Sequence, residues 1–463
     1  MYFNVYLRSV ESSYLKETFR KGIKKITSFF ILFSLIIFNN PVLGNDNEYL
    51  IELLSHKAIS LAVTADLDKI IDRAGQRQLV LLGESSHGTV EFYSLRVEIT
   101  KRLISEKQFS FVAVEGDWPS IDRLNQYVKN MPSALKSAKK VLLSFDRWPE
   151  WMWKNHEIEQ LAEWLRAYNT DLPNDKKVGF HGMDVYGPWD AMDNLLVFTQ
   201  KYLPLYHDEI QNRLQCFARY DRNEWAYAEA ISREGFSCQQ GLIEVSNLLR
   251  TLVITSNAFK DNEFFQAEQN ALIVKNAEDY YRLAIGNNLA SWNSRVQHMW
   301  LSVKRLLYFY GTNSKGIVWA HNTHVGDSRA TPMYLQGVVN IGSLSRYELG
   351  RWRVFVVGFG TNEGQVLAGN SWGSTVEKMQ IPSGVKGSYE DILSKLKLHN
   401  FYLLFDHKDR INPWLNQYRK HRAIGVVYNP ENDALANYVP SILPQRYDAF
   451  IFIRYTNPLE LIE

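Results

Sequence analysis

The sequence predicts an α/β fold with a central, mostly parallel sheet flanked by helices and a large helical insertion. Short apolar runs at 79–82, 111–114, 178–180 and 316–320 have the composition of buried strands. Each run stops at a histidine or an acidic residue, and the carboxyl ends of parallel strands are where ligands bind in such sheets. Between about 191 and 310 the strand signals vanish and helical periodicity replaces them, which indicates the insertion.

The first elements follow in chain order. Residues 49–71 have helical periodicity, and the first strand, 79–82, comes next. Thr89 is expected to be the N-cap of the following helix, with Glu91 favourable in its first turn. Arg96 falls on the inward, apolar face of this helix, so its guanidinium group needs an acidic partner.

The later elements are less regular in spacing. Trp118 and the proline after it open a helix beyond the second strand, and 158–168 is a helix leading to the third. Three tryptophans lie between these two helices and form either a lid or pocket wall, or ordinary core packing: Trp148, Trp151 and Trp153. After the insertion, further strands are expected at 354–357, 402–405, 424–427 and 449–453.

Residues 1–44 have the pattern of a secretory signal. Basic residues precede an uncharged run at 26–38, and small residues follow near Gly44. The run is shorter than the roughly 20 residues that span a bilayer, which favours cleavage after Gly44 over a retained anchor. We therefore expect residues 45–463 to form one exported α/β domain, periplasmic or secreted, without stable membrane insertion.

Charge and cysteine content argue against several classes of function. Without 1–44 the chain has 46 basic and 48 acidic residues, and no basic patch points to nucleic acid. The two cysteines, Cys216 and Cys238, form either a disulfide bond or two buried thiols. Neither lies in a CxxC motif, which argues against redox catalysis and against a cysteine-based zinc site. No feature of the sequence indicates an oligomeric state.

Two histidine motifs suggest proton-transfer chemistry. The first strand is followed by Gly-Glu-Ser-Ser-His-Gly, in which Glu84 can orient His87, a side chain able to take a proton from water near neutral pH. The pattern is not Gly-x-Ser-x-Gly, so a serine nucleophile on a strained turn is not indicated. His321 and His324 follow the fourth strand; for either one alone, a structural hydrogen bond to a backbone carbonyl is the alternative interpretation.

Acidic residues follow the other two strands. Glu115 ends a very apolar strand, where a carboxylate is costly unless paired, and pairing with Arg96 or sharing a proton would place it in the pocket. The remaining candidates are assigned to substrate binding: His181, Asp184, Asp117 and Trp118.

These motifs resemble the erythromycin esterase family. The residues that carry the resemblance are Gly-Glu-Ser-Ser-His-Gly-Thr-x-Glu, Glu115, Gly-Met-Asp-Val at 182–185 and Trp-Ala-His-Asn-Thr-His-Val at 319–325. The resemblance implies a lactone-opening hydrolase, unrelated to the serine α/β-hydrolases, that uses a histidine-activated water. Carried over by position, it implies His87 as the general base, with five further site residues: Glu84, Arg96, Glu115, His321 and His324. It also extends to relatives with no known macrolide substrate.

The sequence therefore predicts a cofactor-free hydrolase of a small-molecule ester or lactone. Glu84 or Glu115 would polarise His87, while His321 or His324, with Arg96, would stabilise the oxyanion or protonate the leaving alkoxide. A metal-dependent hydrolase that uses the same histidines and acids is one alternative. A non-catalytic periplasmic binding protein of the same fold is another.

Overall fold

The computed structural model describes residues 44–220, 222–256 and 261–463. The predicted signal segment lies outside these residues except for Gly44, which begins helix α3 (Gly44–Lys57), so its cleavage stays a prediction. Within the described ranges, no helix combines the length and the apolar character needed to cross a membrane.

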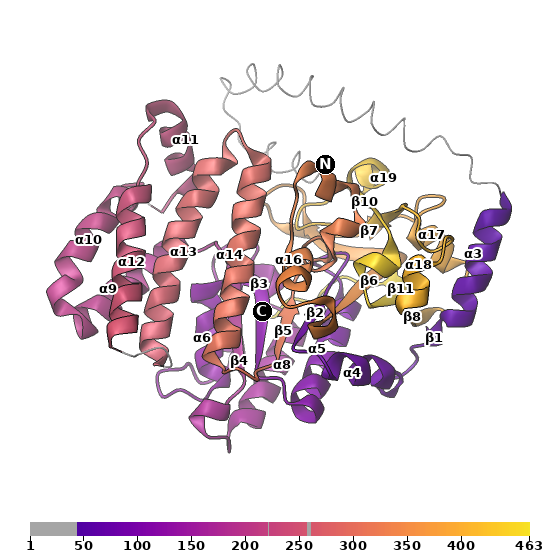
Figure 1. The fold of residues 1–463 in the computed structure, drawn as a ribbon, viewed down its shortest axis with the longest axis horizontal. Coiled ribbons are helices and arrows are strands. Elements are labelled where there is room, and N and C mark those ends of the chain that lie inside the picture. The colour runs from indigo at the N-terminus through magenta and orange to yellow at the C-terminus, as the bar shows by residue number, and fades with distance from the viewer. Residues whose placement is uncertain (1–43, 221, 257–260) are drawn as a thin grey trace.

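A nine-stranded sheet forms the centre of the molecule (Figure 1). Its strands in spatial order are β1 (Ile59–Ser60), β8 (Asn400–Leu404), β11 (Ala449–Thr456), β6 (Val354–Gly369), β2 (Leu79–Leu82), β5 (Gly316–Trp319), β3 (Phe111–Asp117) and β4 (Gly179–Asp184), with β7 (Val376–Ile381) paired to the end of β6. From β11 to β4 all neighbours are parallel, and β1, β8 and β7 pair antiparallel. A separate antiparallel ribbon joins β9 (Arg419–Arg422) to β10 (Tyr438–Ser441). The predicted α/β class with a mostly parallel sheet is confirmed.

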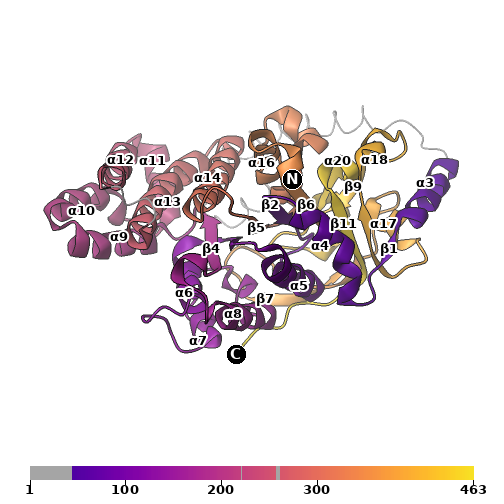
Figure 2. The ribbon, with the colours of Figure 1, turned by 60° about the horizontal axis from the view of Figure 1, so that its bottom comes forward.

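The apolar strands are buried on both faces, which explains their lack of alternation. Leu79 and Leu81 of β2 pack into one hydrophobic cluster, whereas Val80 and Leu82 pack into a second cluster on the other face. Side chains alternate across a strand, so a strand covered on both sides must be apolar at every position. Helices accordingly cover both faces of the sheet (Figure 2).

Five helices contribute to the cluster that holds Val80. They are α4 (Asp68–Gly75), α5 (Val90–Lys107), α6 (Trp118–Val128), α7 (Ala138–Leu143) and α8 (His156–Asn169). The cluster that holds Leu79 is built with α3, α16 (Ile341–Glu348), α17 (Tyr389–Ser394) and the insertion. Short helices and 3-10 turns complete the described fold: α15 (Asn322–Val325), α18 (His407–Ile411), α19 (Asp433–Ala436), α20 (Leu443–Arg446), Thr64–Leu67, Glu150–Met152, Asn174–Lys176, Ser328–Ala330, Pro332–Gln336, Arg351–Arg353 and Pro430–Asn432.

Six helices fill the stretch predicted to be a helical insertion and stand beside the β4 edge of the sheet (Figure 1). They are α9 (Pro188–Tyr202), α10 (Pro204–Ala218), α11 (Glu224–Glu234), α12 (Gln239–Thr255), α13 (Asn262–Ala284) and α14 (Asn288–Phe309). Cys216 in α10 and Cys238, just before α12, form a disulfide bond, so of the two interpretations left open the bridge is the correct one. Helix α14 packs against β3, β4 and β5 and brings the insertion to the sheet.

The helical stretch expected over 49–71 is present but interrupted. Helix α3 covers its first part and α4 its last, while Ile59 of β1 pairs with Tyr402 of β8 and the Asp66 carboxylate accepts hydrogen bonds from the amides of Ala62 and Val63 at 2.8 and 3.0 Å. Such a carboxylate-capped turn competes with a continuous helix.

The strand expected at 424–427 is absent. Ile424 and Val427 form only isolated bridges, to Ser86 and Gly369, because this segment runs past the end of the sheet. Thr89 does occupy the N-cap position of α5, but its hydroxyl is hydrogen-bonded to Ser86 and does not cap the helix.

Candidate active site

The candidate site lies where four parallel strands end. Because β2, β5, β3 and β4 are neighbours in that order, their carboxyl ends meet at one edge of the sheet. Six of the predicted residues lie at or just beyond these ends, and their side chains are all buried: Glu84, His87, Glu115, Asp184, His321 and His324.

The first triad consists of Glu84, His87 and Arg96. The Glu84 carboxylate takes the Arg96 Nη2 hydrogen bond on Oε2 at 2.7 Å and lies 3.0 Å from His87 Nδ1 through Oε1. The Arg96 guanidinium lies 4.3 Å from the centre of the Tyr93 ring and 4.6 Å from that of Trp319, and the side chain is 1% exposed. Glu84 is therefore the acidic partner that Arg96 requires.

The second triad consists of Glu115, His324 and Arg295. Glu115 Oε1 lies 3.0 Å from Arg295 Nη2 and 3.1 Å from His324 Nε2. Its other oxygen accepts the backbone N–H of His321 at 2.8 Å. The predicted pairing of Glu115 with Arg96 is wrong, because Arg96 lies on the far side of Glu84 while Arg295 reaches Glu115 from helix α14.

Arg295 also joins β4 to the site. Its Nε and Nη2 donate to the two carboxylate oxygens of Asp184 at 2.8 and 2.5 Å. This bidentate geometry is the one that arginine forms best with a carboxylate, and it fixes the plane of the guanidinium group. Asp184 thus reaches the cluster through Arg295.

His321 connects the two triads. Its ring centre lies 4.9 Å from that of His87. The backbone N–H of Thr323 donates to His321 Nδ1 at 3.3 Å, and the Thr323 hydroxyl lies 2.8 Å from the same nitrogen. Since Nδ1 accepts, the ring proton of neutral His321 lies on Nε2. The histidines of the two motifs, some 240 positions apart in the chain, therefore converge.

Charge favours a protonated His87. Burial lowers the pKa of His87, but the neighbouring Glu84 carboxylate and, more weakly, Glu115 outweigh burial and Arg96, so the pKa is raised above 6.5. The two carboxylates that act on His87, Glu84 and Glu115, outweigh the one guanidinium group, that of Arg96, and this excess of negative charge stabilises an imidazolium. His87 is consequently poised to take up a proton.

The neighbours of His87 keep fixed charges. Burial would raise the pKa of Glu115, yet His324, His87 and Arg295 hold it well below its usual range. Burial, aided by His87, lowers the pKa of His321 well below 6.5, so this ring stays neutral. The pKa of Arg295 is raised well above its usual value despite burial, chiefly by Asp184. The pKa of His87 is thus raised beside three groups whose pKa values are moved so that Glu115 and Arg295 stay charged and His321 stays neutral.

Comparison with known proteins decides the family. A family model described as erythromycin esterase matches residues 104–456, about three quarters of the chain. The chain belongs to the erythromycin esterase family. The predicted family is confirmed, and membership points to hydrolysis of ester bonds. In this family member the first triad precedes the matched residues, so its assignment depends on geometry.

Three solved structures share the fold of this erythromycin esterase family member. A succinoglycan biosynthesis protein has a TM-score of 0.72 at 20% identity, over 90% of this chain and 99% of its own. A protein from Bacillus cereus has a TM-score of 0.74 at 21% identity, over 90% and 99%. A mutant of the erythromycin esterase EreC in its open conformation has a TM-score of 0.60 at 15% identity, over 87% and 96%. These likenesses establish the fold.

Three residues predicted to bind substrate have structural partners instead. His181 lies inside β4 opposite Ala113, stacks on Trp118 at 5.2 Å and is hydrogen-bonded to Tyr310 at 2.9 Å. Trp118 is 1% exposed and donates to Gln266 at 2.6 Å. Asp117 caps helix α6 by accepting the Ser120 amide at 2.9 Å. Of the four residues assigned to substrate binding, the structure therefore brings only Asp184 to the cluster.

The sequence reasoning missed Arg295 and Trp292, both from the insertion. The Trp292 ring stacks on His324 with centres 4.7 Å apart and planes 10° apart. The two residues are three positions apart, so they lie on one side of α14. A Trp-x-x-Arg pair on a helix with a buried face was the available signal, but nothing local to it indicates which strand edge it reaches.

The tryptophan-rich segment divides between fully buried core residues and one partly buried residue, Trp148, at the edge of the same core cluster. Trp151 and Trp153 are buried in the hydrophobic core, as the packing interpretation expects. Trp148 instead contacts Trp372 at 4.4 Å between ring centres and donates to the Ser374 carbonyl at 3.1 Å. The Trp372 ring also contacts the ring of Tyr186, which lies 5.1 Å from the Arg295 guanidinium. We call Trp148, Trp372 and Tyr186 the aromatic wall.

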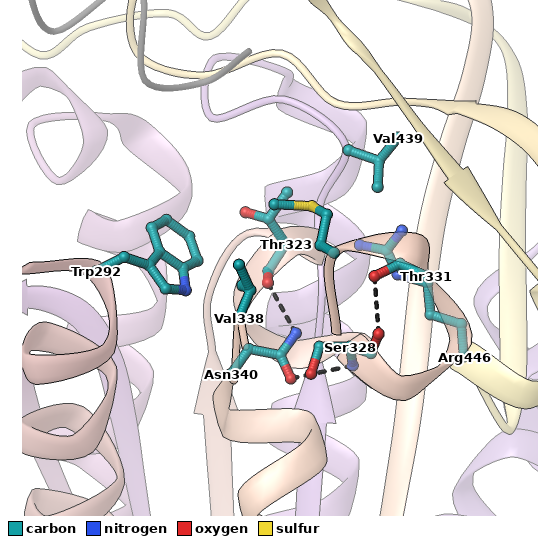
Figure 3. Close-up of a pocket in the computed structure, with 9 residues that line it drawn as sticks. Trp292, Thr323, Ser328, Thr331, Val338, Asn340, Val439 and Arg446 are labelled. Carbon is teal, nitrogen blue, oxygen red and sulfur yellow. Dashed lines mark hydrogen bonds between the residues drawn. The ribbon is translucent and has the colours of Figure 1, made fainter. Parts of the chain in front are cut away.

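A small cavity of about 30 Å³ adjoins the second triad (Figure 3). Trp292, which stacks on His324, and Thr323, which is hydrogen-bonded to His321, form part of its lining. Asn340 fixes the floor by donating to the Thr323 carbonyl at 2.8 Å and accepting the Ser328 amide at 3.2 Å. The other lining residues are Thr331, Met333, Val338, Val439 and Arg446.

In the part of the chain that the structure describes, no group of three or more His, Cys, Asp or Glu side chains is arranged to hold a metal ion. The carboxylates of the cluster are directed at cations of the protein instead: Glu84 at Arg96, and both Glu115 and Asp184 at Arg295.

Proposed function

We propose that this protein is a carboxylic ester hydrolase in which His87 activates a water molecule and no covalent intermediate forms. The observation that carries the proposal is the shared Glu84 carboxylate, held by Arg96 on one oxygen and by His87 Nδ1 on the other. Because a carboxylate only accepts, Nδ1–H donates and the Nε2 lone pair of neutral His87 is the basic one. That lone pair can accept a proton from water.

The reaction then balances as a simple hydrolysis. Water gives one proton to His87 Nε2 as its oxygen attacks the ester carbonyl, and the imidazolium returns that proton to the leaving alkoxide when the C–O bond breaks. The Arg295 guanidinium supplies a donor for the oxyanion. General-base help is worth about 10²–10⁴-fold, and each oxyanion donor about 10²–10³-fold. Arg96 lies behind Glu84, so its part is to orient that carboxylate.

The serines of the first motif fit a nucleophilic role less well. The Ser86 hydroxyl is hydrogen-bonded to Thr89, and His87 Nδ1 is directed at Glu84. A serine nucleophile requires a base within hydrogen-bond reach of its hydroxyl. This arrangement supports water as the attacking group.

For the substrate we propose a small-molecule ester or lactone, with macrolide-like lactones as the first class to examine. The family name and the EreC neighbour support a macrolide, whereas another structural neighbour is a succinoglycan biosynthesis protein. The aromatic wall beside Arg295 supports a ligand with a broad apolar face. We also propose export from the cytoplasm, which the disulfide bond supports because such bonds persist in oxidising compartments.

The test is a mass-spectrometric screen of macrolides and simple esters for the addition of one water. Each substrate that reacts is tested again with His87→Ala. This variant should lose at least about 10³-fold in kcat, because the substitution removes the general base that Glu84 orients. Ser85→Ala serves as the matched control and should retain turnover, with no acylated protein in the intact mass of quenched samples. Near-normal turnover by His87→Ala would overturn the proposal, and binding of ligands without any turnover would favour a binding protein.

A further inference from the structure

A third buried acid–histidine pair, which we call the rear dyad, lies outside both triads. It consists of Glu390 in α17 and His421 in β9, with Glu390 Oε1 2.8 Å from His421 Nδ1 and both side chains 1% exposed. The same carboxylate oxygen accepts the backbone N–H of Arg422 at 2.9 Å. Since the carboxylate only accepts, His421 Nδ1–H donates and its Nε2 is an acceptor. Burial lowers the pKa of His421, which keeps this ring neutral.

The acceptor nitrogen of the rear dyad faces Asn322. The Asn322 side chain accepts the Phe359 N–H at 3.3 Å and donates to the Phe359 carbonyl at 2.7 Å, which defines the orientation of its amide. The same Nδ2 lies 3.4 Å from His421 Nε2, and the Tyr447 hydroxyl lies 3.2 Å from that nitrogen. A contact of 3.4 Å is weak on its own. The rear dyad therefore adds to the two hydrogen bonds between the Asn322 amide and the Phe359 backbone, which hold that amide more strongly.

Asn322 is linked both to Glu84 of the first triad and to His321. Its backbone N–H donates to the Glu84 carbonyl at 2.8 Å, and it directly follows His321 in the chain. Its Oδ1 lies so close to Gly83 that a Cβ at that position would be 2.2 Å away. A shift of the Asn322 side chain therefore displaces the turn that carries Glu84 and the segment that carries His321 together.

We propose that Asn322, Glu390 and His421 are positioning residues that set the distance between the first triad and His321. This inference depends on the proposed hydrolase function. It explains why a buried acid–histidine pair lies against Asn322, the residue that is hydrogen-bonded to Glu84 and follows His321 in the chain. Misplacing reacting groups by about 1 Å costs up to 10²-fold in rate, so a weak contact can still affect turnover.

The test variant is the double substitution Glu390→Gln with His421→Phe, which fills the space and leaves no unpaired buried carboxylate. We expect kcat to fall about tenfold with KM changed less than about twofold. In the pH profile of kcat/KM, the fall in activity on the acid side (the acid limb) should also move to lower pH. His87 faces Glu84, Glu115, Arg96 and His321, and the Glu84 contact that raises its pKa most would loosen. Asn322→Ala carries the same test if the double variant does not fold.

Tyr447→Phe is the matched control, because it removes the other partner of His421 Nε2 and leaves Asn322 in place; kcat and the acid limb should stay as in the wild type. A purely structural role would lower the thermal midpoint and the folded fraction without moving the acid limb per folded molecule, and that outcome would overturn the inference. If His87→Ala keeps its turnover, the proposed function fails instead; if only the rear-dyad variants resemble the wild type, this inference alone fails.

Discussion

The two triads contain the same three residue types but distribute the charge differently. In the first triad Arg96 binds a single carboxylate oxygen of Glu84 and leaves the other oxygen to His87. In the second, Arg295 is divided between Glu115 and Asp184, and Glu115 Oε1 faces both Arg295 and His324. The first arrangement raises the pKa of a histidine, whereas the second raises the pKa of an arginine and so holds a cation in place. The two triads therefore differ in charge because each carboxylate is shared between different partners.

The triads also differ in origin. Glu84, His87 and Arg96 lie within thirteen positions of one strand–helix unit, and Arg96 is enclosed by Tyr93 and Trp319. Arg295 comes from the insertion, 180 positions after Glu115. The first triad therefore depends on the sheet, and the second depends on how α14 packs against it.

The largest expected effect comes from removing the charged part of the first triad. The double variant Glu84→Gln with Arg96→Met avoids an unpaired buried guanidinium. It should lower kcat/KM by about 10³-fold, because the base loses its orientation and its electrostatic support. The His87 pKa is raised chiefly by Glu84, and only neutral His87 is a base, so the acid limb of the pH profile should move to lower pH. An acid limb that stays in place would show that another group titrates.

Removing Arg295 should have the next largest effect and the opposite sign in the pH profile. Arg295→Gln should lower kcat by about 10²-fold through loss of an oxyanion donor. Loss of a nearby cation makes the surroundings of His87 more negative, so the acid limb should stay or move to higher pH. Arg305→Gln is the matched control, since Arg305 lies on the same helix and pairs with Glu268 at 2.7 Å. A downward shift of the limb with Arg295→Gln would contradict the division of roles between the triads.

The aromatic wall should affect binding more than chemistry. Trp148→Ala removes the 4.4 Å contact with Trp372 and should raise KM about three- to tenfold, with kcat changed less than twofold, since a lost aromatic contact is worth about 0.5–1.5 kcal/mol. Trp164→Ala is the control, because Trp164 stacks on Tyr168 within helix α8. A fall in kcat at unchanged KM would place Trp148 in the catalytic step.

The contrast between the two triads also explains how much of the site the sequence could predict. The strand ends, both histidine motifs and the convergence of His87 on His321 follow from local patterns, since parallel strands must end at a common edge. His181 was expected just past the end of a strand but lies inside β4. A residue inside a strand has the same local signature as one just past its end, and only the register with Ala113 distinguishes the two positions. Arg295 could not be placed, because helical periodicity gives the buried face of α14 and not the strand that it meets.

The smallest expected effect on activity comes from the disulfide bond. Cys216→Ser with Cys238→Ser removes a link that closes a 22-residue separation, which should cost the insertion about 3 kcal/mol of stability. Since the bond joins α10 to the start of α12 and the second triad is supplied by α14, kcat should remain within about twofold while the thermal midpoint falls. Turnover that drops about 10²-fold, with the acid limb behaving as it does for Arg295→Gln, would mean that the bridge maintains the packing of α14. The second triad would then depend on an oxidising environment and the first would not.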